Sequence, residues 1–181
     1  MLSPRKQSLP KLLLKSLKKN LLDAKLVAVI GVGSELRGDD IVGVLVAEAI
    51  RKSKKRPTCL KAFIGCTAPE NITGEVKKFL HRAKNEAAHI ILVDAAQMDS
   101  KPGTIRLLEA KAIEGTSFST HVLPLPILMA YFQAQINCGI SVIGIQPRNT
   151  DFGKEPSKEV LLAVPAITKC ILLAVPEKKT R

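Results

Sequence analysis

The chain has no tryptophan, and aromatic residues make up only 3% of its 181 residues. Apolar residues still account for 46% of the composition, so the core must be built from aliphatic side chains. A chain of this length is typical of a single domain with a sizeable core. Because there are few aromatic rings to stack on bases, we expect no nucleic-acid partner.

Long apolar runs are also absent, and no stretch approaches the roughly 18 apolar residues of a membrane span. Lys15, Lys18 and Lys19 interrupt the early leucines, which breaks any apolar region of a secretory signal. The four cysteines, at positions 59, 66, 138 and 170, show no C-x-x-C spacing. We therefore expect reduced thiols in a cytoplasmic protein.

Positive charge is unevenly distributed within the net charge of +12. Residues 1–25 carry seven Lys or Arg and one Asp, and residues 51–56 add five cations. The second cluster is explained by cations at a helix C-terminus before Pro57. Within residues 1–25, the pattern at 8–22 predicts an amphipathic helix. This helix either docks on the domain or lies at a membrane interface, and docking is favoured. We assign residues 1–25 to a basic N-terminal extension and 26–181 to one α/β domain.

Apolar segments that alternate with helical patterns predict the fold class. Strands are expected at 26–31, 58–65, 89–94, 104–109 and 141–145, and helices at about 40–55, 69–85, 126–137 and 159–175. This order predicts a single-domain α/β three-layer sandwich, with a twisted, mostly parallel sheet of about five strands and helices on both faces.

The stretch from Val27 to Gly43 organises the chain as strand, glycine-containing turn and helix, with Asp39 and Asp40 at the helix mouth. One aspartate can cap the helix, but not both, so the second projects toward the ligand crevice beyond the strand end. A dinucleotide fingerprint fails on spacing, because its third glycine position falls on Leu36. The turn is better suited to a cation than to a phosphate.

Asp40, Asp94 and His121 follow elements whose ends meet along one edge of a parallel sheet. Two carboxylates and an imidazole fit a divalent metal or acid–base chemistry. Singly, Asp94 could bind loop amides and His121 could be a structural loop residue, while His81 and His89 are interpreted as solvent-facing or structural. Neither G-x-S-x-G nor H-E-x-x-H occurs, which disfavours a serine hydrolase or a zincin.

Six motifs in order resemble the hydrogenase maturation proteases, especially the hydrogenase 3 (formate hydrogenlyase) type. They are Gly31-Val-Gly33-x-x-x-x-Gly38-Asp39-Asp40-x-x-Gly43, Ala68-Pro69-Glu70-Asn71, Val93-Asp94-Ala95, Pro102-Gly103-x-Ile105, Thr120-His121-x-x-Pro124-Leu125 and Gly144-Ile145-Gln146-Pro147. The resemblance covers roughly residues 26–175 and implies a phosphorylase/hydrolase-like fold. Ser34, where family members usually have Asn, and Ile41, where many have Gly, depart from the pattern.

The resemblance implies an endopeptidase that removes the C-terminal extension of a NiFe-hydrogenase large-subunit precursor after nickel insertion. Nickel is then carried by the substrate and contacted by Asp40, Asp94 and His121, with no tightly bound cofactor in the protease and Asp39 as a cap or support. Such enzymes are often classed as aspartic peptidases, but a metal between Asp40 and Asp94 would keep both ionised, unlike a proton-sharing dyad.

The expected partner is thus the nickel-loaded precursor, with the protease a monomer. The alternatives are a non-cleaving metal-binding or chaperone-like module for hydrogenase assembly and, less favoured, a nucleotide-binding α/β protein.

Overall fold

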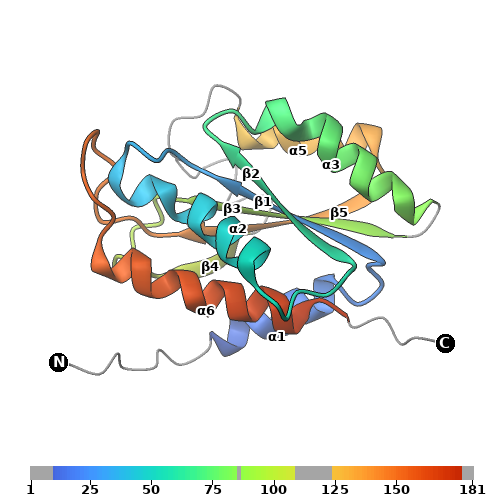
Figure 1. The fold of residues 1–181 in the computed structure, drawn as a ribbon. Coiled ribbons are helices and arrows are strands. Elements are labelled where there is room, and N and C mark those ends of the chain that lie inside the picture. Colours follow the sequence, from blue (N-terminus) through green and yellow to red (C-terminus); the bar gives the residue numbers. More distant parts are fainter. Residues whose placement is uncertain (1–9, 85–86, 109–123, 177–181) are drawn as a thin grey trace.

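The structure is a computed structural model, and residues 10–84, 87–108 and 124–176 of it are described (Figure 1). The strands are β1 (Leu26–Val32), β2 (Leu60–Cys66), β3 (Ala88–Ala95), β4 (Ile105–Leu108) and β5 (Cys138–Ile145). The α-helices are α1 (Lys11–Asn20), α2 (Val42–Lys52), α3 (Thr73–Leu80), α5 (Leu125–Gln135) and α6 (Lys158–Ala174). Short 3-10 helices are η1 (Gly38–Ile41), η2 (Pro69–Ile72) and η3 (His81–Ala83).

The five strands form one sheet in the order β2-β1-β3-β5-β4. The first four run parallel, and β4 pairs antiparallel with β5 at the edge. Figure 1 shows α3 and α5 on one face of the sheet and α2, α6 and α1 on the other. The three-layer, mostly parallel sandwich predicted from the sequence is therefore confirmed.

The two central strands explain why the apolar runs are continuous. Every residue of β1 and β3 is buried, because helices cover both faces of the sheet at these positions. The edge strand β4 is only partly buried and spans four residues. The core therefore lies around β1 and β3, and the carboxyl ends of these neighbours define one edge of the sheet.

Two glycines bring α2 into backbone contact with the sheet. A Cβ on Gly43 would lie 2.1 Å from the Val93 carbonyl oxygen, and one on Gly31 would lie 2.1 Å from the Gly43 carbonyl oxygen. No side chain fits at either position, since real Cβ atoms do not approach so closely. The glycines of the first motif therefore fix the start of α2 against the ends of β1 and β3.

The N-terminal helix packs on the domain, as favoured from its sequence. Leu13, Leu17 and Leu21 are buried at helical spacing, and α1 contacts α6, β4 and β5. At its end, Asn20 Nδ2 donates a hydrogen bond to Ser141 Oγ (3.1 Å), and the same oxygen lies 2.8 Å from His89 Nε2. His89 is thus a buried structural residue, one of the two roles expected for it.

Two further observations concern helix length and the cysteines. Among the described residues, no helix has the length and apolar character needed to cross a membrane. All four cysteines are free, so no disulfide contributes to this fold.

Candidate active site

The turn between β1 and α2 is folded back over the start of the helix. Gly33 has a φ of +136°, and a Cβ there would lie 1.8 Å from the Asp40 carbonyl oxygen. Gly38 also lies in the left-handed region, with a φ of +49°. Glycine accepts such a backbone without the steric penalty of other residues. The turn can therefore place an amide next to the Asp40 side chain.

Asp40 has one fixed and one unpartnered carboxylate oxygen. The residue is completely buried, and its Oδ2 accepts a hydrogen bond from the Ser34 amide (2.8 Å). Its Oδ1 is also buried and has no hydrogen-bond partner within the described part of the chain. An unpaired buried carboxylate oxygen is costly unless a cation or donor completes it. The geometry thus leaves one oriented oxygen available as a ligand.

Asp94 lies near the carboxyl end of β3 and is also fully buried. In the sheet its neighbour Val93 pairs with Gly31 of β1, and Asp94 itself pairs with Gly144 of β5. The short helix η1, which carries Asp40, contacts β3. The structure therefore brings the elements of both predicted carboxylates to the same edge of the sheet, as their positions after neighbouring parallel strands suggested.

His121 lies outside the described residues, so its place relative to the two carboxylates remains a prediction. Across the described ranges, no group of three His, Cys, Asp or Glu side chains could hold a metal ion.

Asp39 acts as a support, one of the two roles expected for it. Its Oδ2 accepts hydrogen bonds from the amides of Arg148 (2.6 Å) and Asn149 (3.3 Å) and from Ser157 Oγ (2.9 Å), while Oδ1 accepts from the Ser157 amide (2.5 Å). Bonds to a charged acceptor are the stronger kind. This buried carboxylate therefore ties the turn that carries Asp40 to the β5–α6 loop.

Gln146 is a site residue whose role the sequence motif did not reveal. It is buried, and its Oε1 accepts from the amides of Met98 (2.7 Å) and Ser100 (3.3 Å), while Nε2 donates to Gln97 Oε1 (2.9 Å). These bonds fix the loop that follows β3, directly after Asp94. The only sequence feature that could have indicated this role is a polar residue at the end of a buried strand, followed by proline.

The one cysteine at this edge of the sheet is poorly suited to nucleophilic attack. Cys66 ends β2 with a φ of +48° and pairs with Val32 of β1. Desolvation, with the nearby Glu35 charge as a smaller cause, raises the pKa of its thiol above the ordinary value. Since the thiolate is the reactive form, this thiol stays protonated and weakly nucleophilic at neutral pH.

Charge at the rim of the site is locally paired. Arg148 forms a two-point ion pair with Glu159 through Nε (3.3 Å) and a second, shorter contact from Nη2. The hydrogen bond from Arg148 is the main reason that the pKa of Glu159 lies below its usual value. Glu159 is therefore ionised and paired with Arg148 of the β5–α6 loop.

Comparison with known proteins places this geometry in a family. The family model described as hydrogenase maturation protease (HycI) matches residues 44–174. The Methanocaldococcus jannaschii protein MJ0631, named as a hydrogenase maturation protease, is 31% identical over 168 residues, covering 88% of this chain and 94% of its own length. The hydrogenase 3 maturation protease of Escherichia coli K12 is 30% identical over 117 residues, covering 64% of this chain and 69% of its own length.

A solved structure agrees over nearly the whole fold. The [NiFe] hydrogenase maturation protease HycI from Thermococcus kodakarensis KOD1 superimposes with a TM-score of 0.73 at 25% identity, covering 88% of this chain and 98% of that one. The sequence relatives, the family model and the shared fold lead to one conclusion: the chain belongs to the hydrogenase maturation protease family.

Proposed function

We propose that the protein is an endopeptidase that removes the C-terminal extension of a NiFe-hydrogenase large-subunit precursor after nickel insertion. In this proposal the substrate-bound nickel is the recognition element. The partner is the nickel-loaded precursor, and the protease acts as a cytoplasmic monomer. Membership in the maturation protease family supports the peptidase assignment.

The buried Oδ1 of Asp40, which has no hydrogen-bond partner among the described residues, is the observation that carries the nickel part of the proposal. The amide of Ser34 holds Oδ2 and thereby fixes the direction in which Oδ1 presents its lone pairs. With one available oxygen, the Asp40 carboxylate can bind a metal through a single atom. Asp94, at the end of the neighbouring strand, contributes the second ligand. A cation between the two would keep both carboxylates ionised, whereas a dyad that shares a proton would not.

The chemistry of cleavage then depends on positioning. Asp40, Asp94 and His121 complete the coordination of the nickel that the precursor carries, and this fixes the scissile peptide at the sheet edge. The metal polarises the scissile carbonyl or a water molecule. The protonated state of the Cys66 thiol supports a route without a covalent thiol intermediate.

Asp40→Asn tests the ligand role with little change of shape. The amide oxygen can still accept the hydrogen bond from Ser34, but an NH₂ group then occupies the place of Oδ1 and repels a cation. We expect processing of the nickel-loaded precursor, followed by mass spectrometry of the released extension, to slow by about 100-fold or more. His121→Ala should have a similar effect, and Asp151→Asn, an exposed residue in the β5–α6 loop, is the matched control.

Processing at the wild-type rate by both the Asp40 and His121 variants would refute nickel recognition by these residues. An unchanged precursor mass with the wild-type protein would instead favour a non-cleaving assembly module. Metal analysis gives a separate test, because two carboxylates and one imidazole should bind nickel weakly without the substrate. A stoichiometric, tightly held metal in the purified protein would contradict a substrate-borne ion.

A further inference from the structure

The outer surface of α6 is apolar where a helix of a soluble protein usually carries charge. Leu161, Pro165, Lys169 and Leu173 are exposed and follow one another at four-residue spacing along its outward side. The side chains of Leu161 and Leu173 are 47% and 49% exposed. Only one of these four positions is charged, whereas the solvent face of an amphipathic helix is normally polar.

The neighbouring helix α1 combines exposed leucines with a row of cations. Lys11, Lys15, Lys18 and Lys19 are all exposed, and no acidic residue occurs between positions 11 and 22. Leu12 at the start of the helix is 79% exposed, and Leu22 just beyond its end is 74% exposed. Because α1 packs against α6, the two outward surfaces adjoin. We call them the α1–α6 face, made of Lys11, Leu12, Lys15, Lys18, Lys19, Leu22, Leu161, Pro165, Lys169 and Leu173.

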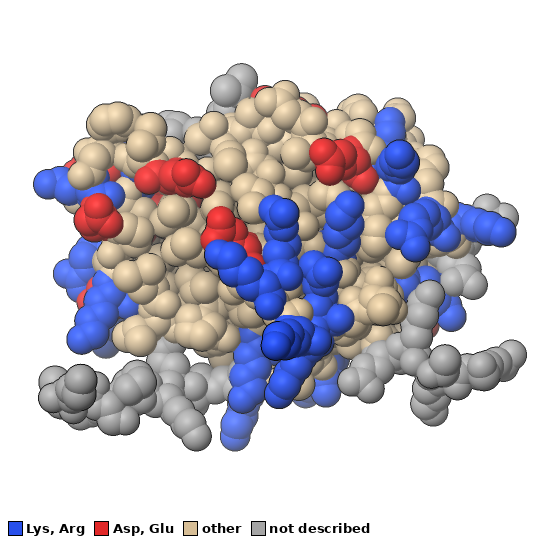
Figure 2. All heavy atoms as spheres, viewed as in Figure 1, with Lys and Arg blue, Asp and Glu red and all other residues tan. Residues whose placement is uncertain are grey.

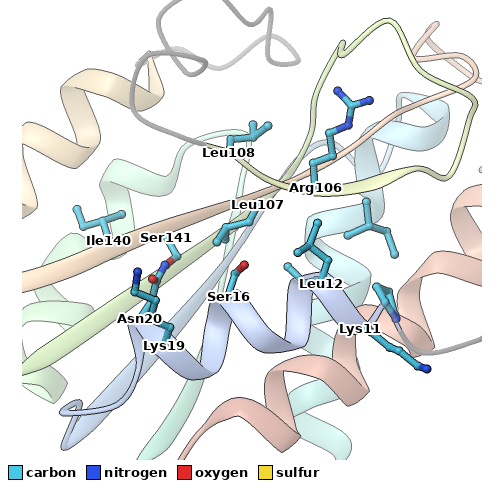
Figure 3. Close-up of a pocket in the computed structure, with 13 residues that line it drawn as sticks. Lys11, Leu12, Ser16, Lys19, Asn20, Arg106, Leu107, Leu108, Ile140 and Ser141 are labelled. Atoms are coloured by element: carbon cyan, nitrogen blue, oxygen red, sulfur yellow. The ribbon is translucent and has the colours of Figure 1, made fainter.

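A groove of about 870 Å³ separates α1 from the edge strand β4. Figure 3 shows Leu12 and Ser16 extending from α1 toward Leu107 on β4. Of the described residues that line the groove, three are cations, Lys11, Lys19 and Arg106, and none is a carboxylate. The lining also includes apolar side chains such as Leu12, Leu107 and Leu108, so the groove offers both a place for a negatively charged group and apolar surface.

Among the described residues, the carboxylates of α2 and α6 pair with other cations and not with the lysines of α1. Glu48 forms an ion pair with Lys52 on its own helix (2.9 Å), and Glu159 is engaged by Arg148. Figure 2 shows Lys and Arg side chains over the middle and lower part of the view, where α2, α6 and α1 lie, with a few carboxylates between them. The layer therefore presents an excess of positive charge around protruding leucines.

We propose that the α1–α6 face binds peripherally to an anionic membrane surface. Lysine is depleted in protein–protein interfaces, where aromatic residues and arginine dominate, and single-stranded nucleic acid is bound largely by aromatic stacking. This face carries lysines and leucines and no aromatic side chain. Leucines that enter the boundary between headgroups and acyl chains, with lysines extending to the phosphates, match that composition.

The location of the face is compatible with an accessible active site. Asp40 and Asp94 belong to the edge formed by the strand ends, while α1 and α6 lie in the helical layer that covers one face of the sheet (Figure 1). A molecule that lies on its helical layer keeps the strand ends open at the side. Membrane binding and access of a substrate to the candidate site are therefore independent.

Co-sedimentation of the full-length protein with vesicles of phosphatidylcholine, with and without phosphatidylglycerol, tests the proposal. We expect binding only to the anionic vesicles, and loss of binding as salt is raised. Each lysine near such a surface strengthens binding by about fivefold, so Lys15→Glu/Lys18→Glu should weaken it by about 25-fold or more. The control Lys78→Glu/Lys84→Glu changes the net charge equally on the other side of the sheet and should weaken binding by less than about threefold.

A second pair of variants tests the leucines. Leu12→Ser/Leu22→Ser should lower binding at least about tenfold, because both apolar side chains then stay in water. Ile127→Ser/Tyr131→Ser, at exposed positions of α5 on the opposite face, should leave it unchanged. Equal thermal midpoints would show that all variants are folded.

Three results would overturn the proposal. The first is no sedimentation with anionic vesicles at low salt, and the second is equal loss in the test and control variants. The third is retention of the protein by RNA or by an acidic protein through these same lysines in the absence of vesicle binding, which would give the face a different partner.

Discussion

His89 provides a quantitative prediction of how stability depends on pH. The ring is buried near the start of β3 beside Ser141, and burial lowers its pKa from the ordinary 6.5 to about 4. The unfolded chain therefore binds a proton at pH values where the folded protein does not. The contribution of His89 to stability is complete above pH 6.5 and is lost as the pH falls toward 4.

The size of this effect follows from the two pKa values. They differ by about 2.5, and each unit corresponds to about 1.36 kcal/mol, so the full loss is about 3.4 kcal/mol. Between pH 7 and pH 4.5 the loss is about 2.4 kcal/mol. His89→Gln removes the titrating group and retains a polar side chain that can reach Ser141. Between pH 7 and pH 4.5, the free energy of unfolding of this variant should therefore fall by about 2.4 kcal/mol less than that of the wild type.

Urea unfolding at pH 7, 6, 5 and 4.5 measures the difference. Carboxylates titrate in both proteins and cancel when the wild type is compared with the variant, so the comparison isolates His89. His81→Gln is the control, because His81 is exposed. Parallel stability profiles for the wild type and His89→Gln would refute the reasoning, as would an NMR titration that places the pKa of His89 near 6.5.

Three further predictions concern the scaffold of the site. Gly43→Ala should destabilise the protein by about 3 kcal/mol in denaturant unfolding, because its Cβ would meet a carbonyl of β3, whereas Gly74→Ala, with open space around it, should be neutral or slightly stabilising. Asp39→Asn should cost about 2 kcal/mol through weakened charged hydrogen bonds, and a similar cost for Asp151→Asn would disprove this assignment. Gln146→Ala should speed hydrogen exchange of the loop amides after β3 by about tenfold, and unchanged exchange would show that Gln146 does not hold that loop.

The features that the sequence predicted are those governed by local patterns. Apolar runs predicted strands at the positions of β1 and β3, the continuous apolar run of β3 indicated a central strand, and the leucine spacing of α1 indicated its packed side. The shared location of Asp40 and Asp94 followed from a general property, since the carboxyl ends of parallel strands meet at one edge. None of these inferences required knowledge of distant contacts.

The features that could not be predicted from the sequence depend on contacts between residues that are far apart along the chain. Asp39 binds backbone amides more than 100 residues away, so its role could only be narrowed to a cap or a support. His89 is buried because Ser141, on another strand, supplies its polar contact. Likewise, the antiparallel direction of β4 depends on its pairing with β5, more than 30 residues further along the chain, and could not be read from its own four residues.

The docking of α1 has a consequence for how the chain can be shortened. Residues 1–25 lie outside the shared motifs, yet three leucines of this segment belong to the same core as the residues of α6 and the sheet. A version that started at β1 would leave that strip of α6 and β5 uncovered and prone to self-association. Residues 10–25, which look like an appendage in the sequence, are thus part of the packed core of the domain.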